Sequence, residues 1–302
     1  MIPQFSEFSA LKGHPCEIGE SPVCVNESSL VWVDAGNARI YQSDLTKGEV
    51  RGYRMDVPVT AIASAGPDAW ILVTKEGIFR CDERFRQLKL LGNPVRGLLD
   101  LVLNDGVVSP CGDLWFGSMN ERELEASDGS LYLMLHDSLK IVQLDIGFSV
   151  TNGIAFNRKL RRAYVSNMFQ RQVIEYTLAP DFRHILKRRV LITIPEHKGM
   201  PDGLKVDSFG YLYVCHWDAG LVSIYNSVGS LLKEVQLPVR HATRCTFGGP
   251  GFRQLFVTTG NYGMDKDEQF QSPWSGLTLC ADISVSGEAE ETFNLTPEPS
   301  CV

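Results

Sequence analysis

Residues 26–33, Asn-Glu-Ser-Ser-Leu-Val-Trp-Val, join a cluster of turn-forming residues to a short apolar strand centred on Trp32. The same arrangement occurs five more times along the 302-residue chain, with the central aromatic at Trp70, Trp115, Tyr164, Tyr213 and Phe256. Successive aromatics are separated by 38, 45, 49, 49 and 43 residues. A repeat of about 45 residues that contains strands and turns is typical of a β-propeller, in which each repeat forms one blade.

Further strands are expected after the aromatic ones, in residues 38–41, 77–80, 172–176 and 220–225, where apolar and polar residues alternate. Long helical periodicity is absent, which argues against a doubly wound α/β fold, because that fold needs a helix between successive strands. We therefore predict an all-β fold: a single six-bladed β-propeller domain spanning residues 1–302, with its blades in roughly residues 10–295. We expect residues 5–11 to add a closing strand to the last blade.

The composition is that of an ordinary globular protein, with 44% hydrophobic and 22% charged residues, which excludes global disorder. A net charge of −7 disfavours nucleic acid and anionic membrane surfaces as partners. The first residues have no basic start and no apolar core, so no signal peptide is expected. The eight cysteines are scattered without a Cys-x-x-Cys motif, which favours reduced thiols and a cytoplasmic location. The sequence leaves the oligomeric state open.

Four polar residues recur at nearly the same offset from the aromatic of their repeat. Glu20 and Asn152 lie 12 residues before it, and Asn104 and Asp202 lie 11 residues before it. Each begins a repeat, and the first strand of a propeller blade lines the central channel. These positions would then form a ring of two carboxylates and two amides. Such oxygen donors suit Ca²⁺, Mg²⁺ or Mn²⁺, and Zn²⁺ also accepts carboxylate oxygen.

The two remaining repeats differ at this depth. The second offers Pro58 or Val59, and the sixth offers Arg244 or Cys245, so the predicted ring is not uniformly acidic and one side is left for a substrate. The alternative interpretation is that the four polar residues only form turns, because Asn-Gly, Asn-Asp-Gly and Pro-Asp-Gly are common turn sequences.

Six short motifs follow one another along nearly the whole chain. They are GESPV at residues 19–23, NDG at 104–106, GSM at 117–119, TNGIAF at 151–156, GMPDG at 199–203 and FGG at 247–249. Together they resemble the family of regucalcin (senescence marker protein), gluconolactonase and insect luciferin-regenerating enzyme. The resemblance implies a six-bladed propeller that binds one divalent metal and hydrolyses lactones. It implies Glu20, Asn152 and Asp202 as metal ligands, Asp202 also as general base or acid, and Asn104 as a contact to the substrate or a metal-bound water.

The sequence departs from the family pattern around the NDG motif. Many sugar lactonases of the family carry Arg, which helps to bind substrate hydroxyls, at the position of Val102, and Asp-Pro where this chain has Ser109 and Pro110. These differences put the sugar specificity in doubt and leave room for a less polar lactone. Glu121 and Arg122 begin a polar loop that we interpret as a substrate-contacting lid at the pocket mouth; a solvent-exposed loop is the alternative.

The leading hypothesis is a metal-dependent hydrolase that opens a small-molecule lactone, such as an aldonolactone, with metal-activated water and Asp202 as general base. One alternative is a non-catalytic propeller that binds calcium or a protein; another is a hydrolase of a different ester. The fold alone does not separate these functions. The sequence contains no Gly-x-Ser-x-Gly elbow, no Walker loop and no Gly-x-Gly-x-x-Gly motif, so serine-nucleophile and nucleotide chemistry lack support.

Overall fold

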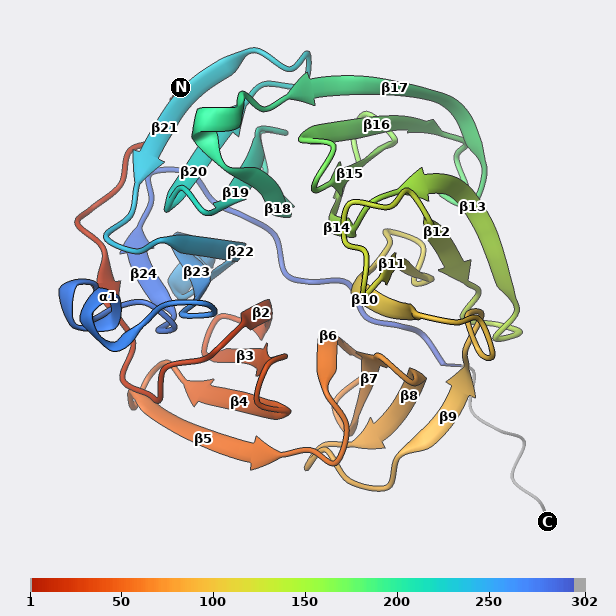
Figure 1. Cartoon of the computed structure of the whole chain (residues 1–302), viewed down its shortest axis with the longest axis horizontal. Coiled ribbons are helices and arrows are strands. Elements are labelled where there is room, and N and C mark those ends of the chain that lie inside the picture. Colours follow the sequence, from red (N-terminus) through yellow and green to blue (C-terminus); the bar gives the residue numbers. More distant parts are fainter. Residues whose placement is uncertain (1, 296–302) are drawn as a thin grey trace.

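The computed structural model describes residues 2–295, which form six antiparallel sheets of four strands around a central channel (Figure 1). The predicted six-bladed β-propeller is therefore confirmed. Each aromatic of the sequence repeat lies in the second strand of a blade, and four of them, Trp115, Tyr164, Tyr213 and Phe256, are fully buried. The repeat thus marks the same strand in every blade.

In five of the six blades the strands run outward from the channel in chain order. The first three blades contain β2 (Gly19–Asn26), β3 (Ser29–Asp34), β4 (Arg39–Asp44) and β5 (Glu49–Arg54); β6 (Val59–Ser64), β7 (Ala69–Thr74), β8 (Gly77–Asp82) and β9 (Lys89–Gly92); and β10 (Leu101–Val108), β11 (Leu114–Asn120), β12 (Gly129–Met134) and β13 (Ile141–Phe148). The fourth and fifth contain β14 (Thr151–Asn157), β15 (Arg162–Asn167), β16 (Gln172–Leu178) and β17 (Ile185–Thr193); and β18 (Met200–Val206), β19 (Leu212–Trp217), β20 (Leu221–Tyr225) and β21 (Leu231–Gln236).

The sixth blade combines β22 (His241–Gly248), β23 (Gln254–Gly260) and β24 (Leu279–Asp282) with the N-terminal β1 (Ser9–Ala10). Strand β1 pairs antiparallel with β24, with Ser9 opposite Cys280, and an isolated bridge joins Phe5 to Ile283. The expected closing strand is therefore confirmed. Because both ends of the sequence contribute to one sheet, the ring closes without leaving an open gap between its first and last blades.

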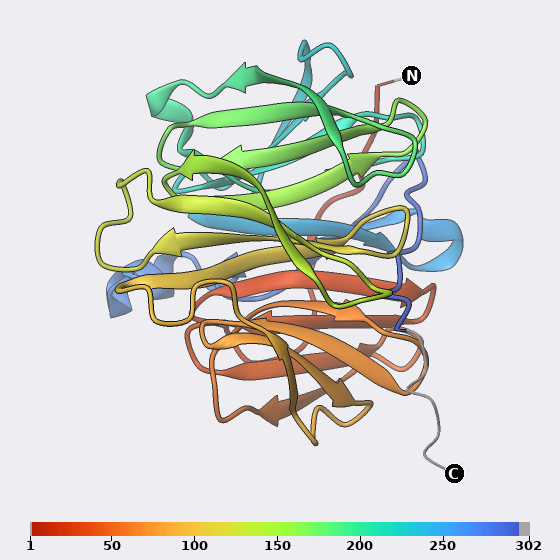
Figure 2. The ribbon, with the colours of Figure 1, turned by 90° about the vertical axis from the view of Figure 1, so that its right-hand side faces the viewer.

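In the part of the chain that the structure describes, helical structure is limited to short connections: η1 (Glu196–Lys198), η2 (Pro250–Phe252) and α1 (Lys266–Gln271). Within residues 2–295 no helix is long and apolar enough to cross a membrane. The loop after β11 and helix α1 project from one face of the ring, as the side view shows (Figure 2).

The core consists of six apolar clusters, each lying between two neighbouring blades. Strand β11 shows why, because successive side chains of a strand point to opposite faces. Trp115 packs with residues of the fourth blade, whereas Phe116 packs with residues of the second. Every blade is therefore held on both sides, and the strands that line the channel are fixed in place.

One element that the repeat did not reveal is the segment of residues 283–295, which follows β24 and crosses the far end of the channel (Figure 1). The amide of Glu290 donates to the Cys24 carbonyl at 3.3 Å, and that of Phe293 donates to the Ser64 carbonyl at 2.8 Å. The Glu290 carboxylate pairs with Lys205 at 2.5 Å. We call residues 283–295 the channel-closing segment, since it covers the end opposite α1 (Figure 2).

Candidate active site

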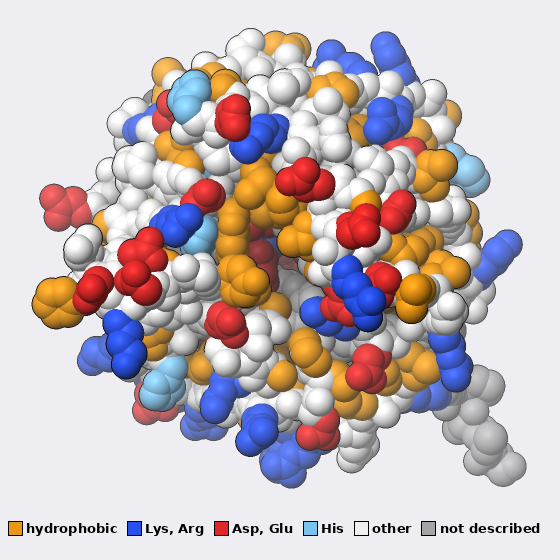
Figure 3. Space-filling view, in the orientation of Figure 1, with side chains coloured by type: hydrophobic (Ala, Val, Ile, Leu, Met, Phe, Trp, Pro, Cys, Tyr) orange, Lys and Arg blue, Asp and Glu red, His pale blue; other side chains and the backbone are white. Residues whose placement is uncertain are grey.

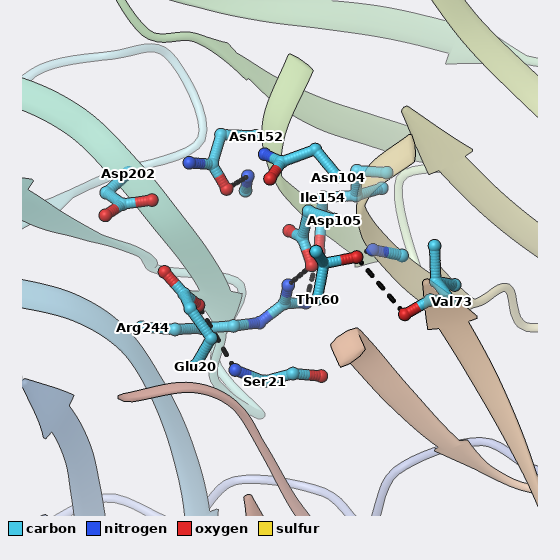
Figure 4. Close-up of polar contacts among 12 residues, drawn as sticks. Glu20, Ser21, Thr60, Val73, Asn104, Asp105, Asn152, Ile154, Asp202 and Arg244 are labelled. Carbon is cyan, nitrogen blue, oxygen red and sulfur yellow. Dashed lines mark hydrogen bonds and ion pairs between the residues drawn. The ribbon is translucent and has the colours of Figure 1, made fainter. Parts of the chain in front are cut away.

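A pocket with a volume of about 690 Å³ occupies the end of the channel away from the channel-closing segment. Its mouth is visible as a hollow at the centre of the face shown in Figure 3. All four residues of the predicted ring, Glu20, Asn104, Asn152 and Asp202, line this pocket. They come from the first strands of four blades and lie around one common space (Figure 4).

A β-bulge in the first strand of every blade explains why these side chains face the channel. The regular pairing with the second strand is interrupted at the same depth in all six blades, between Glu20 and Val23, Val59 and Ala61, Leu103 and Gly106, Asn152 and Ile154, Pro201 and Leu204, and Ala242 and Arg244. A bulge bends the strand and re-aims its side chains. The ring residues all sit within or beside these interruptions.

Two glycines of the motifs are required for the close approach of neighbouring strands. Gly153 has a φ of 34°, and a Cβ there would collide with the carbonyl oxygen of Asp202. Gly203 lies against the side-chain stem of Arg244, where a Cβ would also collide. The glycines of the Asn-Gly and Asp-Gly pairs therefore do more than form turns, because they bring Asn152 and Asp202 together at the channel wall.

The hydrogen bonds around the ring leave oxygen atoms free for a ligand. Glu20 accepts a bond from the Ser21 amide at 3.1 Å, and the Asn152 side-chain oxygen accepts one from the Gly153 amide at 3.0 Å. Asn104 donates to the Thr151 carbonyl at 3.1 Å, which orients its amide. Asp202 Oδ1 is buried without a hydrogen-bond partner. An unsatisfied buried carboxylate oxygen is costly unless a proton or a cation accompanies it.

The carboxylates of the pocket repel one another in a poorly solvated space. Burial, together with repulsion from Asp105, raises the pKa of Glu20 to about 8. Burial raises the pKa of Asp202 well above its usual value, and the charges of Glu20 and Asp105 add to that effect. A cation placed between the carboxylates would reverse both contributions.

The oxygen atoms around the ring fit a hard divalent cation, and the third protein ligand would be the amide oxygen of Asn152. Among residues 2–295 no group of three or more His, Cys, Asp or Glu side chains is arranged to hold a metal. Glu20, Asn152 and Asp202 would supply two carboxylates and one amide oxygen. Oxygen donors of this kind, with the unpartnered Asp202 Oδ1 among them, suit Ca²⁺, Mg²⁺ or Mn²⁺.

The sixth blade contributes a buried arginine to the channel. The sequence predicted only that Arg244 or Cys245 lies at the depth of the ring residues. Arg244 is 6% exposed, pairs with Asp105, and donates to the Ile154 carbonyl at 3.3 Å. Burial opposes its charge, but Asp105, Glu20 and Glu290 outweigh that effect and raise the pKa of Arg244. The other candidate of this blade, Cys245, is buried in the core.

The rim of the pocket contains some of the further predicted residues. Glu121 lines the pocket and pairs with Lys75 at 2.9 Å. Arg122 is not among the lining residues; its side chain is 73% exposed and pairs with Asp100 at 2.9 Å. Val102 is 8% exposed and also lies outside the lining.

A stacked pair of rings stands at the rim of the pocket. The rings of Trp217 and His241 lie 4.0 Å apart, and both line the pocket. In the second blade, Pro58 and Thr60 line it, whereas Val59 belongs to the core.

Residues 18–261 match the family model described as the SMP-30/Gluconolactonase/LRE-like region. The chain belongs to this family. The resemblance drawn from the six motifs is therefore confirmed, and the match covers the strands that carry all four ring residues.

Members of the SMP-30/gluconolactonase family are similar to the chain over nearly its whole length. A pentonolactonase of Haloferax volcanii is 25% identical and is aligned over 91% of this chain and 94% of its own. Human regucalcin is 26% identical over 92% of this chain and 95% of its own. The solved structure of a calcium-binding protein, regucalcin, from Agrobacterium tumefaciens has the same fold, with a TM-score of 0.90, 24% identity, and coverage of 96% of this chain and 98% of that one.

Proposed function

We propose that the protein is a metal-dependent lactonase that hydrolyses a small-molecule lactone to the corresponding hydroxy acid. The observation that carries this proposal is the unpartnered Oδ1 of Asp202 in a deep pocket beside Glu20 and Asn152. Membership of a family that includes named lactonases supports the reaction class. Glu20, Asn152 and Asp202 would hold the cation, for which Ca²⁺, Zn²⁺, Mn²⁺ and Mg²⁺ are the candidates.

The chemistry that such a cation supplies when bound is polarisation of the lactone carbonyl and a lower pKa for water. In our proposal, Asp202 takes a proton from the water whose oxygen forms the new bond to the carbonyl carbon. It returns that proton to the ring oxygen as the ring C–O bond breaks. Asn104, whose amide is oriented by Thr151, holds the substrate carbonyl. Glu121 is the proposed contact at the rim, and the exposed Arg122 is not part of the proposal.

We also propose a cytoplasmic location. The seven cysteines that the structure describes are all free thiols, and five of them are buried. Reduced thiols of this kind are typical of a reducing compartment.

The test is hydrolysis of a panel of aldonolactones and simple lactones by protein that has been stripped of metal with a chelator. Ca²⁺, Mn²⁺, Mg²⁺ and Zn²⁺ are then added singly, and acid release is followed with a pH indicator. We expect little turnover without metal and recovery with at least one cation. Absence of turnover with every lactone and every cation would contradict the proposal and favour a non-catalytic binding propeller.

A further inference from the structure

The pocket above the ring residues has two apolar sides. On one side lie Met119 near the end of β11, Val150 just before β14, and Met168 and Phe169 just after β15, together with Leu124 from the loop after β11. We call these five residues the hydrophobic wall. Figure 3 shows hydrophobic side chains gathered at the mouth of the central hollow.

The opposite side of the pocket is aromatic. The Trp217 ring at the end of β19 stacks on the His241 ring of β22, with 4.0 Å between the ring centroids. The centroid of the Tyr262 ring lies 6.3 Å from that of Trp217. We call these three residues the aromatic wall. Burial lowers the pKa of His241, which favours its neutral form. The aromatic wall therefore contributes three uncharged rings to the lining of the pocket.

The two rim cations are already held by carboxylates. Lys75 pairs with Glu121 at 2.9 Å, and Arg240 pairs with Asp218 at 2.6 Å and with Glu268 at 3.3 Å. A polyhydroxylated ring needs a donor or acceptor for each hydroxyl that it buries. The five side chains of the hydrophobic wall offer no conventional hydrogen-bond groups to such hydroxyls.

The size of the pocket also exceeds what one small ring needs. Its volume of about 690 Å³ lies in the range of about 300–1,000 Å³ that is usual for drug-sized ligands. A lactone ring placed at Asp202 and Asn104 would leave the space between the two walls for a substituent.

We propose that the preferred substrate is a lactone that carries an alkyl or aryl substituent, with its ring at Asp202 and its substituent between the hydrophobic and aromatic walls. This class differs from the aldonolactones expected from the family resemblance. The proposal rests on the proposed lactonase function, since it names the substrate of the same pocket. Burial of apolar surface between the walls supplies the selectivity, at roughly fourfold in kcat/KM for each buried methylene.

The experiment compares kcat/KM of the metal-loaded protein for D-glucono-δ-lactone, δ-hexalactone, δ-octalactone, δ-decalactone and dihydrocoumarin. We expect kcat/KM to rise with alkyl length, by up to about 250-fold from δ-hexalactone to δ-decalactone, which differ by four methylenes at about fourfold each, and gluconolactone to be the poorest substrate. Turnover that favours gluconolactone, or that ignores alkyl length, would overturn this proposal and leave the lactonase function intact. No turnover of any lactone would overturn both.

A variant distinguishes substrate contact from a structural role. Phe169→Ala is expected to lower kcat/KM for δ-decalactone by about tenfold, with a smaller loss for δ-hexalactone, because less substituent reaches the wall. Phe209→Ala is the matched control, since Phe209 is 62% exposed and does not line the pocket. An equal loss for both substrates in Phe169→Ala would assign this side chain to packing alone and count against the proposal.

Discussion

Arg244 in the sixth blade and Asp105 in the third reach each other across the channel and form a buried ion pair. The two residues are 139 positions apart in sequence and 6% and 3% exposed. Arg244 also donates to the Ile154 carbonyl of the fourth blade at 3.3 Å. The ring of blades is therefore joined through its centre as well as through the apolar clusters between neighbouring blades.

We expect Arg244→Met to lower the free energy of unfolding by about 3–5 kcal/mol, because it leaves the Asp105 carboxylate buried without its partner. Urea unfolding followed by tryptophan fluorescence measures this change. The double variant Arg244→Met/Asp105→Asn should recover part of the loss, since it removes the unpaired charge. Equal stability of the wild type and the single variant would show that the pair contributes nothing.

Asp202→Asn is expected to lower kcat by about 10²–10⁴-fold, the usual contribution of a general base, while the fold is retained. The amide keeps the shape of the side chain but cannot take a proton. Lactone hydrolysis under metal saturation measures the loss, and circular dichroism checks the fold. Asp68→Asn, in the exposed turn between β6 and β7, serves as the control. Wild-type turnover in folded Asp202→Asn would rule out this mechanism.

Cation binding should stabilise the wild-type protein, because the unfolded chain lacks the site. At a free concentration of 100 times Kd the gain is about 2.7 kcal/mol, which appears as an upward shift in Tm. Glu20→Gln should lose most of this shift, whereas Glu27→Gln, at an exposed position, should keep it. The same cation-dependent shift in both variants would remove Glu20 from the ligand set.

The ring residues could be predicted because each blade repeats one register. The count from the blade aromatic varies by one residue because the hairpins between the first and second strands differ in length. Trp115 and Tyr213 pair with residues eight positions earlier in the sequence, whereas Tyr164 pairs with a residue nine positions earlier. In the second blade, counting 11 or 12 residues back from Trp70 gives Val59 or Pro58. Thr60, which lies where the strand pairing is interrupted between Val59 and Ala61, lines the pocket beside Pro58.

The channel-closing segment could not be predicted from the repeat, because its contacts are long-range and do not recur. Glu290 contacts Lys205 and Thr246, far from it in sequence. The sequence also did not show where the Arg244 side chain points, because its partner Asp105 comes close only when the ring of blades closes. The blades could therefore be predicted from local sequence patterns. The contacts at the far end of the channel could not, because they form only when the ring closes.

Phe293 tests how much the channel-closing segment stabilises the fold. It is fully buried against the cluster between the second and third blades, so Phe293→Ala should lower the free energy of unfolding by about 3–5 kcal/mol. Phe270→Ala is the matched control, because Phe270 is 87% exposed and its loss should change stability by less than about 0.5 kcal/mol. Similar effects of the two substitutions in urea unfolding would mean that the segment packs only weakly.

Asp113 predicts a pH dependence of stability. Its carboxylate accepts bonds from Arg183 Nε at 2.6 Å and from the His136 amide at 2.9 Å. Burial by itself would raise the pKa of Asp113, but these partners outweigh it and hold the pKa below its usual value. The folded-state pKa is then lower than the unfolded-state value of about 3.9, so the stabilisation is fully present above that pH and is lost as the pH falls through the folded-state pKa.

Asp113→Asn should therefore lower the free energy of unfolding at pH 7 by about 3 kcal/mol, the lower end of the range for breaking a buried pair, since the Arg183 side chain is 27% exposed. The difference between wild type and variant should shrink as the pH falls below about 4, because protonation of Asp113 removes the same charge from the wild type. Urea unfolding at pH 7, 4 and 3 measures it. A difference that stays constant over this range would show that the carboxylate charge of Asp113 does not stabilise the fold.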